Sequence, residues 1–428
     1  MKTAVMWFRR DLRLEDNQAL RHALLSGFPV LPLFIFDSEI VDDLPREDPR
    51  VSFIYAQTKK IHQMLRSRGS SLVVKHGKPI SVWHELLSSH QVAGVYINKD
   101  YEPYALERDG CIEKLLQDRE IPLHRFKDQV IFEEDEIVKK DGDPYTVFTP
   151  YKRRWLERFA TEKIPPATQS ATGEFLSLDL PFPEISELGF RKSPQHVPPY
   201  DLSRLDQYES LRDYPAAQAT SHLSPHLRFG TVGIREIIAQ LGPGQDTFLA
   251  ELIWREFFMQ ILYHFPQVVD QNFHAKYNGI AWRNNEDDFN RWCHGETGYP
   301  MVDAGMRQLN ETGTMHNRVR MVTASFLCKH LLIDWRWGEA YFAGKLLDYE
   351  LSSNNGNWQW AAGTGCDAAP YFRIFNPHEQ LKKFDKNLEY VRTWIPEYNE
   401  NSYIDPVVEH KIARKRALEV YRKGIFTF

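Results

Sequence analysis

The residues 348–377 form the densest group in the chain that could hold a flat, bulky ligand. Alanines and glycines at 361–363, 365, 368 and 369 would let the backbone approach such a ligand closely. Asn354 and Trp358 are four residues apart, so on a helix they would share a face. Buried asparagine and tryptophan both need polar partners. This segment is therefore predicted to bind a ligand; the alternative is a tight aromatic helix junction without one.

Two further pairs have helical spacing. Glu251 and Trp254 are three residues apart in the helix-like segment 251–263, and Asn317 and Met321 are four apart in the amphipathic segment 315–332. Each pair would present its two side chains on one helix face.

A third candidate site is the run 220–224, Thr-Ser-His-Leu-Ser. Hydroxyl side chains and successive backbone N–H groups at a helix start can bind phosphate. They can also simply cap the helix, which is the commoner use of such a run.

The elements that must position these residues differ between the two halves of the chain. Short apolar runs at 3–8, 29–36, 71–75 and 94–98 alternate with helix-like segments such as 51–68 and 79–90. This alternation predicts a parallel sheet with helices on both faces. No Gly-x-Gly-x-x-Gly follows the first run, so a dinucleotide fingerprint is absent and the layer is Rossmann-like in topology only.

The strand pattern ends well before the C-terminal half. Residues 161–200 are rich in Pro, Ser, Thr and Glu, and from about residue 200 onward only helical periodicity is found. We therefore predict an α/β + all-α chain with an α/β domain at 1–130, a connector at 131–200 and an all-helical domain at 201–428.

Composition limits the class of protein. The formal net charge of −5 argues against bulk affinity for nucleic acid but leaves room for a local basic face. The four cysteines are widely spread without metal-type spacing, which predicts free thiols, a cytoplasmic location and no metal. The N-terminus lacks the pattern of a signal peptide, and no apolar run reaches the length of a membrane span.

Residues 348–377 resemble the flavin-binding signature of the photolyase/cryptochrome family, in the form found in class I cyclobutane-pyrimidine-dimer (CPD) photolyases. Residues 7–14, Trp-Phe-Arg-Arg-Asp-Leu-Arg-Leu, resemble the family's opening motif, so the resemblance covers essentially the whole chain. It implies an FAD-binding helical domain and light-driven repair of pyrimidine dimers in damaged DNA by an electron from excited reduced FAD. An N-terminal antenna domain is also implied.

The resemblance assigns roles residue by residue. The implied flavin contacts are Tyr208, Thr220, Ser221, Leu223, Ser224, Arg255, Arg320, Asp348, Glu350 and Asn354. The implied contacts with DNA are Arg212, Glu251, Trp254, Asn317, Arg318, Met321, Trp360 and Arg373, with a flipped dimer between Trp254 and Trp360. The implied catalytic set is Glu251 at a pyrimidine edge, Asn317 and Met321 beside the lesion, Asn354 at flavin N5, and an electron-transfer chain of Trp358, Trp335 and Trp282.

Three positions separate the relatives. Repair of the (6-4) lesion uses histidine where this chain has Asn317 and Met321. Plant cryptochromes tend to have Asp, and animal ones Cys, at the position of Asn354. Both comparisons favour a CPD photolyase; the alternatives are a (6-4) photolyase, a signalling cryptochrome, and a redox flavoprotein without a light function.

The second chromophore is left open. Folate-binding relatives carry Asn-Glu where this chain has Tyr104 and Ala105, which argues against a folate antenna. A deazaflavin, a second flavin or no antenna are the other choices. Nothing in the sequence indicates a coiled coil or a swapped strand, so a monomer is expected.

Overall fold

The computed structural model describes residues 1–162, 173–399 and 402–426, which form two compact units. The first unit comprises Met1–Glu136, Trp155–Tyr200 and His222–Gly242, and the second comprises Ile137–Arg154, Asp201–Ser221 and Pro243–Phe428. These units differ from the predicted segments 1–130, 131–200 and 201–428. The predicted connector contributes residues to both units, and residues 222–242 pack with the first one.

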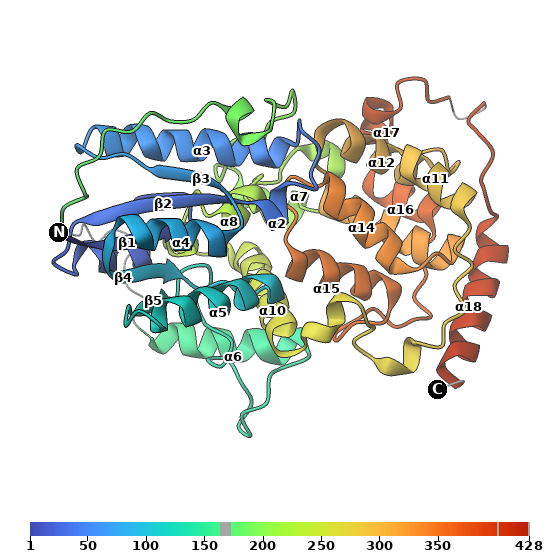
Figure 1. Ribbon diagram of the computed structural model, residues 1–428. Helices are drawn as coiled ribbons and strands as arrows, with labels where there is room; N and C mark the ends of the chain where they lie inside the picture. The colour runs from blue at the N-terminus through green and yellow to red at the C-terminus, as the bar shows by residue number, and fades with distance from the viewer. Residues whose placement is uncertain (163–172, 400–401, 427–428) are drawn as a thin grey trace. The chain divides into compact units, whose positions relative to one another are not determined.

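The first unit contains a five-stranded parallel sheet, as predicted (Figure 1). Its strands lie in the order β3-β2-β1-β4-β5. Their bounds are β1 Lys2–Phe8, β2 Val30–Asp37, β3 Val73–Gly77, β4 Gln91–Asn98 and β5 Leu123–Phe126. The edge strand β5 was not predicted, because two basic residues lie between its two apolar ones and leave no apolar run.

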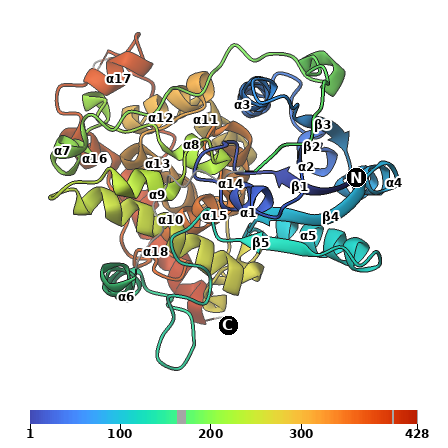
Figure 2. The same ribbon diagram turned by 90° about the vertical axis from the view of Figure 1, so that its left-hand side faces the viewer.

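Both faces of the sheet are covered (Figure 2). On one face, Ala4, Met6 and Phe8 of β1 pack with residues of α1 and α3. On the other face, Val5 and Trp7 pack with α4 and α5. Strands buried on both faces read as continuous apolar runs, which is why the runs could be recognised in the sequence.

Apart from the helices that cover the sheet, the helices of the first unit are short. Its helices are α1 Gln18–Leu24, α2 Ser38–Val41, α3 Pro49–Arg66, α4 Pro79–Ser89, α5 Pro103–Gln117, η1 Ile185–Leu188, α8 Ser224–Phe229 and α9 Ile234–Ala239. Helix α6, Phe148–Thr161, has residues in both units.

The second unit is all-helical over its described residues, as predicted. Its helices are α7 Leu205–Leu211, η2 Pro215–Ala217, α10 Asp246–His264, η3 Pro266–Val269, η4 Ala275–Tyr277, α11 Glu286–His294, α12 Pro300–Thr312, α13 Asn317–Ser325, η5 Phe326–Leu331, α14 Trp335–Lys345, α15 Leu351–Ala362, α16 Pro377–Phe384, α17 Glu389–Trp394 and α18 His410–Phe426.

One predicted helix differs in detail. The segment 315–332 is not one regular helix: α13 begins at Asn317 and is followed by the π-helix η5. The imidazole of His316 caps α13, because its Nδ1 accepts from the backbone N–H of Arg318 at 3.1 Å. Burial, followed by the charge of Arg320, lowers the pKa of His316 to about 4, so the capping imidazole is neutral near pH 7.

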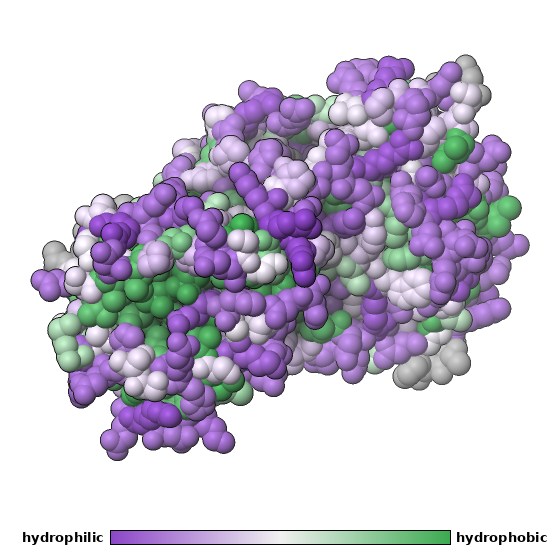
Figure 3. All heavy atoms as spheres, turned by 45° about the horizontal axis from the view of Figure 1, so that its top comes forward, coloured by the Kyte–Doolittle hydropathy of each residue, from purple (hydrophilic) through white to green (hydrophobic). Residues whose placement is uncertain are grey.

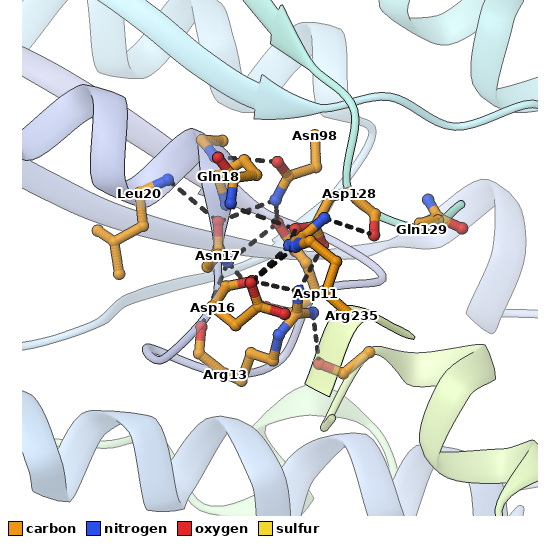
Figure 4. A network of polar contacts seen from close by, with 12 residues as sticks. Asp11, Arg13, Asp16, Asn17, Gln18, Leu20, Asn98, Asp128, Gln129 and Arg235 are labelled. Atoms are coloured by element: carbon orange, nitrogen blue, oxygen red, sulfur yellow. Dashed lines mark hydrogen bonds and ion pairs between the residues drawn. The ribbon is translucent and has the colours of Figure 1, made fainter. Parts of the chain in front are cut away.

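A buried polar network holds residues 222–242 in the first unit (Figure 4). Arg235 donates from Nε to Asp16 at 2.8 Å and from Nη2 to Asp128 at 2.6 Å. Arg13 donates to the other carboxylate oxygen of Asp128 at 2.7 Å. Since Asp128 is 1% exposed, the two guanidinium groups supply the interactions that water would otherwise give.

The surface is mixed in polarity. The face shown in Figure 3 is mainly hydrophilic, with a hydrophobic area on its left-hand part. Across the ranges that the structure describes, no helix is long and apolar enough to cross a membrane.

Helix α15 packs unusually closely against its neighbours in the second unit. A Cβ atom added at Gly356 would lie 2.2 Å from the ring of Phe258 on α10. One added at Gly338 on α14 would lie 2.1 Å from the ring of Trp358. Glycine at both positions therefore lets aromatic rings rest directly on backbone.

We expect Gly356→Ala to destabilise the second unit by about 1–3 kcal/mol, because the ring of Phe258 must move from its position. Urea denaturation would measure the change. Gly344→Ala on α14 is the matched control, since a Cβ there meets nothing within 4 Å. The control should be neutral or stabilising, by up to about 1 kcal/mol. Equal effects of the two changes would contradict the packing argument.

Candidate functional site

The first part of the site is the face of α15 that carries Asn354 and Trp358. Asn354 is 8% exposed, and its Nδ2 donates to the side chain of Glu339 on α14 at 2.9 Å and to its backbone carbonyl at 3.1 Å. Burial raises the pKa of the Glu339 carboxyl group. These bonds commit the amide nitrogen of Asn354, so its carbonyl oxygen remains to accept a hydrogen bond from a ligand.

Two ion pairs lie just before α15. Arg320 donates to Asp348 at 3.0 Å, the pair that was predicted from the sequence. Arg255 on α10 donates to Glu350 at 3.1 Å, and Glu350 is 5% exposed. Both pairs fix the entrance to α15, because each joins a residue of the segment 348–350 to a different helix.

A second cluster combines residues of α7, α10 and α13. Arg212, next to α7, forms an ion pair with Glu251 on α10. Arg318 on α13 donates to Asp213 at 2.6 Å. Three of the residues predicted to contact DNA or a base, Arg212, Glu251 and Arg318, are therefore already in ion pairs within the protein.

Tyr208 belongs to the same cluster. Its ring lies edge-on to Phe248 at 5.1 Å, and the Arg212 guanidinium lies 5.6 Å from its centroid. Burial, with the nearby carboxylate of Glu251, raises the pKa of Tyr208 to about 12. The phenol thus keeps its proton and can donate a hydrogen bond to an anion.

The predicted phosphate run is divided between the units. Thr220 and Ser221 belong to the second unit. Leu223 and Ser224 belong to the first, where Leu223 precedes α8 without a side-chain capping bond. The structure describes each half separately, so the joint phosphate site stays a prediction.

Trp254 on α10 presents an aromatic surface that is supported by a second ring. The ring of Trp254 stacks on Phe148 with centroids 3.6 Å apart and planes 9° apart. Phe148 is 8% exposed, whereas Trp254 and Trp360 are half-buried. Trp254 therefore has one supported face and enough exposure for a ligand to reach it.

The pair on α13 lies at the surface. Asn317 is exposed, Met321 is half-buried, and Asn317 Nδ2 lies 3.9 Å from the sulfur of Met321. The predicted shared face is confirmed by this contact. Arg373 is exposed in the loop that follows α15.

The three predicted relay tryptophans differ in exposure. Trp358 is 2% and Trp335 0% exposed, while Trp282 is half-buried. Trp335 donates from Nε1 to Asn272 at 2.9 Å. Trp358 also has Trp292 as an edge-on neighbour at 6.1 Å. The order from buried to exposed suits a chain that ends at the surface.

Tyr104 and Ala105 in the first unit occupy the positions at which folate-binding relatives carry Asn-Glu. Tyr104 donates its hydroxyl hydrogen to Asp37 at 2.7 Å, and Ala105 is 4% exposed. The carboxylate of Asp37 lies at the end of β2, so the tyrosine closes over the end of that strand. Burial followed by this hydrogen bond raises the pKa of Tyr104.

Sequence reasoning missed Glu339, Phe148 and Trp292. Each acts on a predicted residue from a different helix, so no local spacing links them. One general rule could have helped: a buried asparagine needs a polar partner. It would have indicated that Asn354 has a neighbour such as Glu339.

Comparison with known families assigns both halves of the chain. Residues 4–170 match the family model "DNA photolyase", and residues 248–402 match "FAD binding domain of DNA photolyase". These matches define a flavoprotein with the two domains of a light-dependent DNA repair enzyme.

Relatives of full length agree. The deoxyribodipyrimidine photo-lyase of Halobacterium salinarum is 36% identical over 98% of this chain and 99% of its own length. That of Escherichia coli is 36% identical over 99% of this chain and all of its own length. The chain therefore belongs to the DNA photolyase family, and it is an FAD-dependent carbon–carbon lyase of the deoxyribodipyrimidine photo-lyase type.

Solved structures show the same fold. A class III photolyase from Agrobacterium tumefaciens matches with a TM-score of 0.87 and 33% identity over 99% of this chain and 98% of its own. A Sulfolobus tokodaii photolyase described as holding two FAD molecules matches with a TM-score of 0.84 and 33% identity over 98% and 100%. A Synechocystis cryptochrome gives a TM-score of 0.86 at 25% identity over 98% and 99%.

The residues of the second unit fit FAD. The fixed Asn354 amide offers an acceptor, and Arg320 and Arg255 are held beside the start of α15 by Asp348 and Glu350. Flavin ring nitrogens that carry hydrogen in the reduced state are suitable donors to that acceptor. A flavin placed there would be favoured in its reduced form.

We expect Glu339→Leu to weaken this preference, because the Asn354 amide can then turn its nitrogen toward the flavin. The loss of one oriented hydrogen bond is worth about 1 kcal/mol. The prediction is faster air oxidation of the reduced flavin and a lower reduction potential, measured in a spectroelectrochemical cell. Glu311→Leu is the control, because Glu311 is an exposed glutamate on a different helix, α12. An unchanged potential in Glu339→Leu would contradict the proposed orientation.

Proposed function

We propose that this enzyme repairs cyclobutane pyrimidine dimers in DNA with blue or near-UV light. The observation that carries this proposal is the pair Asn317 and Met321 on α13, in contact at the surface. Splitting a cyclobutane ring after electron transfer needs little proton transfer. An amide and a thioether, which do not titrate near pH 7, are therefore compatible with it, whereas the (6-4) reaction uses histidines at these positions.

FAD, held by residues such as Arg320, Arg255 and Asn354, would supply the light-excited electron that splits the ring. The protein has to hold the dimer flat, close and away from water. We assign the two walls of the lesion slot to Trp254 and Trp360, because aromatic planes bind extruded bases by stacking. The cost of flipping the damaged bases is roughly a few kcal/mol.

Glu251 would hydrogen-bond a pyrimidine edge. Its partner Arg212 supports this role, because the ion pair orients the carboxylate. When DNA binds, Arg212 can exchange part of this contact for a phosphate, as Arg318 can exchange its contact with Asp213. Arg373, exposed after α15, is assigned to the same backbone contact.

The tryptophans have a separate task. Trp358, Trp335 and Trp282 would pass electrons inward to reduce an oxidised flavin, and they take no part in dimer splitting. Flavin phosphates are assigned to Tyr208, Thr220 and Ser221 of the second unit.

Two other functions remain candidates for testing. One is a signalling cryptochrome, because the Synechocystis cryptochrome has the same fold. A (6-4) photolyase shares the cofactor. For the antenna, the contact of Tyr104 with Asp37 disfavours folate. Because the Sulfolobus tokodaii photolyase is described as holding two FAD molecules, a second flavin is the first choice to test.

We further propose a monomeric cytoplasmic protein. Its cysteines Cys111, Cys293, Cys328 and Cys366 are free thiols, which suits a reducing compartment. Sedimentation of the purified protein would test the monomer, and cell fractionation would test the location.

The deciding experiment uses an oligonucleotide with one cyclobutane dimer, chemically reduced protein and blue light, with a dark control. Recovery of intact pyrimidines only in the light supports the proposal. If the flavin is bound but only the (6-4) product is repaired, the lesion class is wrong. If neither lesion is repaired, the signalling function takes its place.

Phe148→Ala should weaken binding of the dimer, because Trp254 loses the ring that supports it. An aromatic stack is worth about 0.5–1.5 kcal/mol, so the affinity should fall about two- to tenfold. Binding of a dimer-containing and an intact oligonucleotide would be compared by fluorescence anisotropy. Phe159→Ala removes a comparable stack, on Trp155 in the first unit, and should leave the discrimination unchanged.

Trp335→Phe should slow photoreduction of the oxidised enzyme while sparing repair by pre-reduced enzyme. Phenylalanine is far harder to oxidise than tryptophan, so the chain is interrupted at its buried middle member. Photoreduction would be followed by flavin absorbance and repair by the dimer assay. Equal loss of both activities would mean that Trp335 is needed for the fold or for flavin binding instead.

A further inference from the structure

Two arginines lie together where the π-helix η5 ends, beside Trp282. Arg283 directly follows Trp282 and donates from Nη1 to the carbonyl oxygen of Leu331 at 3.1 Å. Arg416 on α18 donates from Nη2 to the carbonyl oxygen of His330 at 2.5 Å. The two carbonyls belong to consecutive residues, so the guanidinium groups are neighbours.

The charges at this place do not balance. Asp288 is the carboxylate that pairs with Arg283, at 3.1 Å. The pKa of Arg416 is lowered, first by burial and then by the charge of Arg283, as expected for two cations held close together. Arg416 Nε is buried and finds no hydrogen-bond partner among the residues that the structure describes. The pair thus carries more positive charge than Asp288 neutralises.

The place coincides with the surface end of the tryptophan chain. Trp282 is half-buried, and its ring meets Tyr421 of α18 edge-on at 5.8 Å. Tyr421 is fully buried, and its hydroxyl donates to the carbonyl of Ala362 at 2.8 Å. Lys329 Nζ lies 3.6 Å from the centroid of the Tyr421 ring.

A radical cation formed on Trp282 should therefore remain on Trp282 and should not oxidise Tyr421. Oxidising a tyrosine requires its proton to leave, and a backbone carbonyl cannot take the proton from Tyr421. The next electron must come to Trp282 from a donor in solution.

We propose that Arg283 and Arg416 form a binding site for small anionic one-electron reductants next to Trp282. This inference rests on the proposed function of the tryptophan chain. It adds the chemical class of the donor, which that function leaves undefined.

The electron transfer balances simply. The donor gives one electron to the Trp282 radical cation, which returns to neutral tryptophan and keeps its indole proton. The donor is left oxidised by one electron; for ascorbate monoanion, the oxidised donor releases its proton to water. No further co-reactant is needed.

A purely structural role of Arg283 and Arg416 must be distinguished from anion binding. Arginine side chains at the end of a helix often just bind its last carbonyls. Here each arginine uses one terminal nitrogen for that purpose, which leaves the other donors for an anion. Glu419, three residues after Arg416 on α18, reduces the positive field, so the site should prefer small anions over an extended polyanion.

The test is transient absorption of the tryptophan radical in oxidised holoprotein after a light flash. The second-order rate constant of radical decay would be measured with ascorbate and with neutral hydroquinone, at low and high concentrations of sodium chloride. We expect a strong decrease with salt for ascorbate, on the order of tenfold, and little change for hydroquinone.

The double variant R283Q/R416Q keeps amide donors for the two carbonyls but loses the charge. In the double variant, the rate constant of radical decay with ascorbate should fall to the value that the unchanged protein has at high salt. The rate constant with hydroquinone should stay the same. R291Q is the matched control, because Arg291 on α11 is exposed and also donates to a backbone carbonyl, that of Glu296. Dimer repair by pre-reduced double variant should be unchanged, which confirms an intact fold.

Each outcome has a distinct meaning. If the radical forms and decays with the same salt dependence in the unchanged protein and the double variant, the anion site is overturned while the chain stands. If R291Q has the same effect as the double variant, only general surface charge is involved and the site is again overturned. If no radical forms on Trp282, the proposed chain itself fails, and the anion site fails with it.

Discussion

The close approach of helix α15 to its neighbours is the constraint on which the second unit depends. Gly356 lets the ring of Phe258 rest on the α15 backbone, and Gly338 does the same for Trp358. Interiors packed this tightly transmit small shifts instead of absorbing them. The hydrogen bond between Asn354 and Glu339 can therefore have a fixed geometry, because the two helices that carry these side chains cannot slide past each other.

Around this rigid centre the polar residues are arranged in pairs. Arg320 with Asp348 and Arg255 with Glu350 stabilise the start of α15. Arg212 with Glu251 plays the corresponding role nearer the surface. On the proposal that Arg212 contacts DNA, such pairing would let a protein of negative net charge hold its local arginines in place for phosphate.

Much of this could be predicted from the sequence, and the limits have a physical reason. The strands were recognisable because burial on both faces makes them continuously apolar, as in Val30–Asp37. The pair Asn317 and Met321 was recognisable because helical spacing is local. The partners Glu339 of Asn354 and Phe148 of Trp254 were not, because they come from other helices and only packing brings them together.

The network around Asp128 has a consequence for how the chain is made. Asp16 and Asp128 leave the ribosome well before Arg235, the cation that bridges them. At typical synthesis rates the delay is on the order of ten seconds. During that interval Arg13 is the one guanidinium of this network available to Asp128, and Asp16 lacks its ion pair with Arg235. The first unit therefore cannot complete this network until residues 222–242 have been made, after synthesis of the second unit has already begun at Ile137.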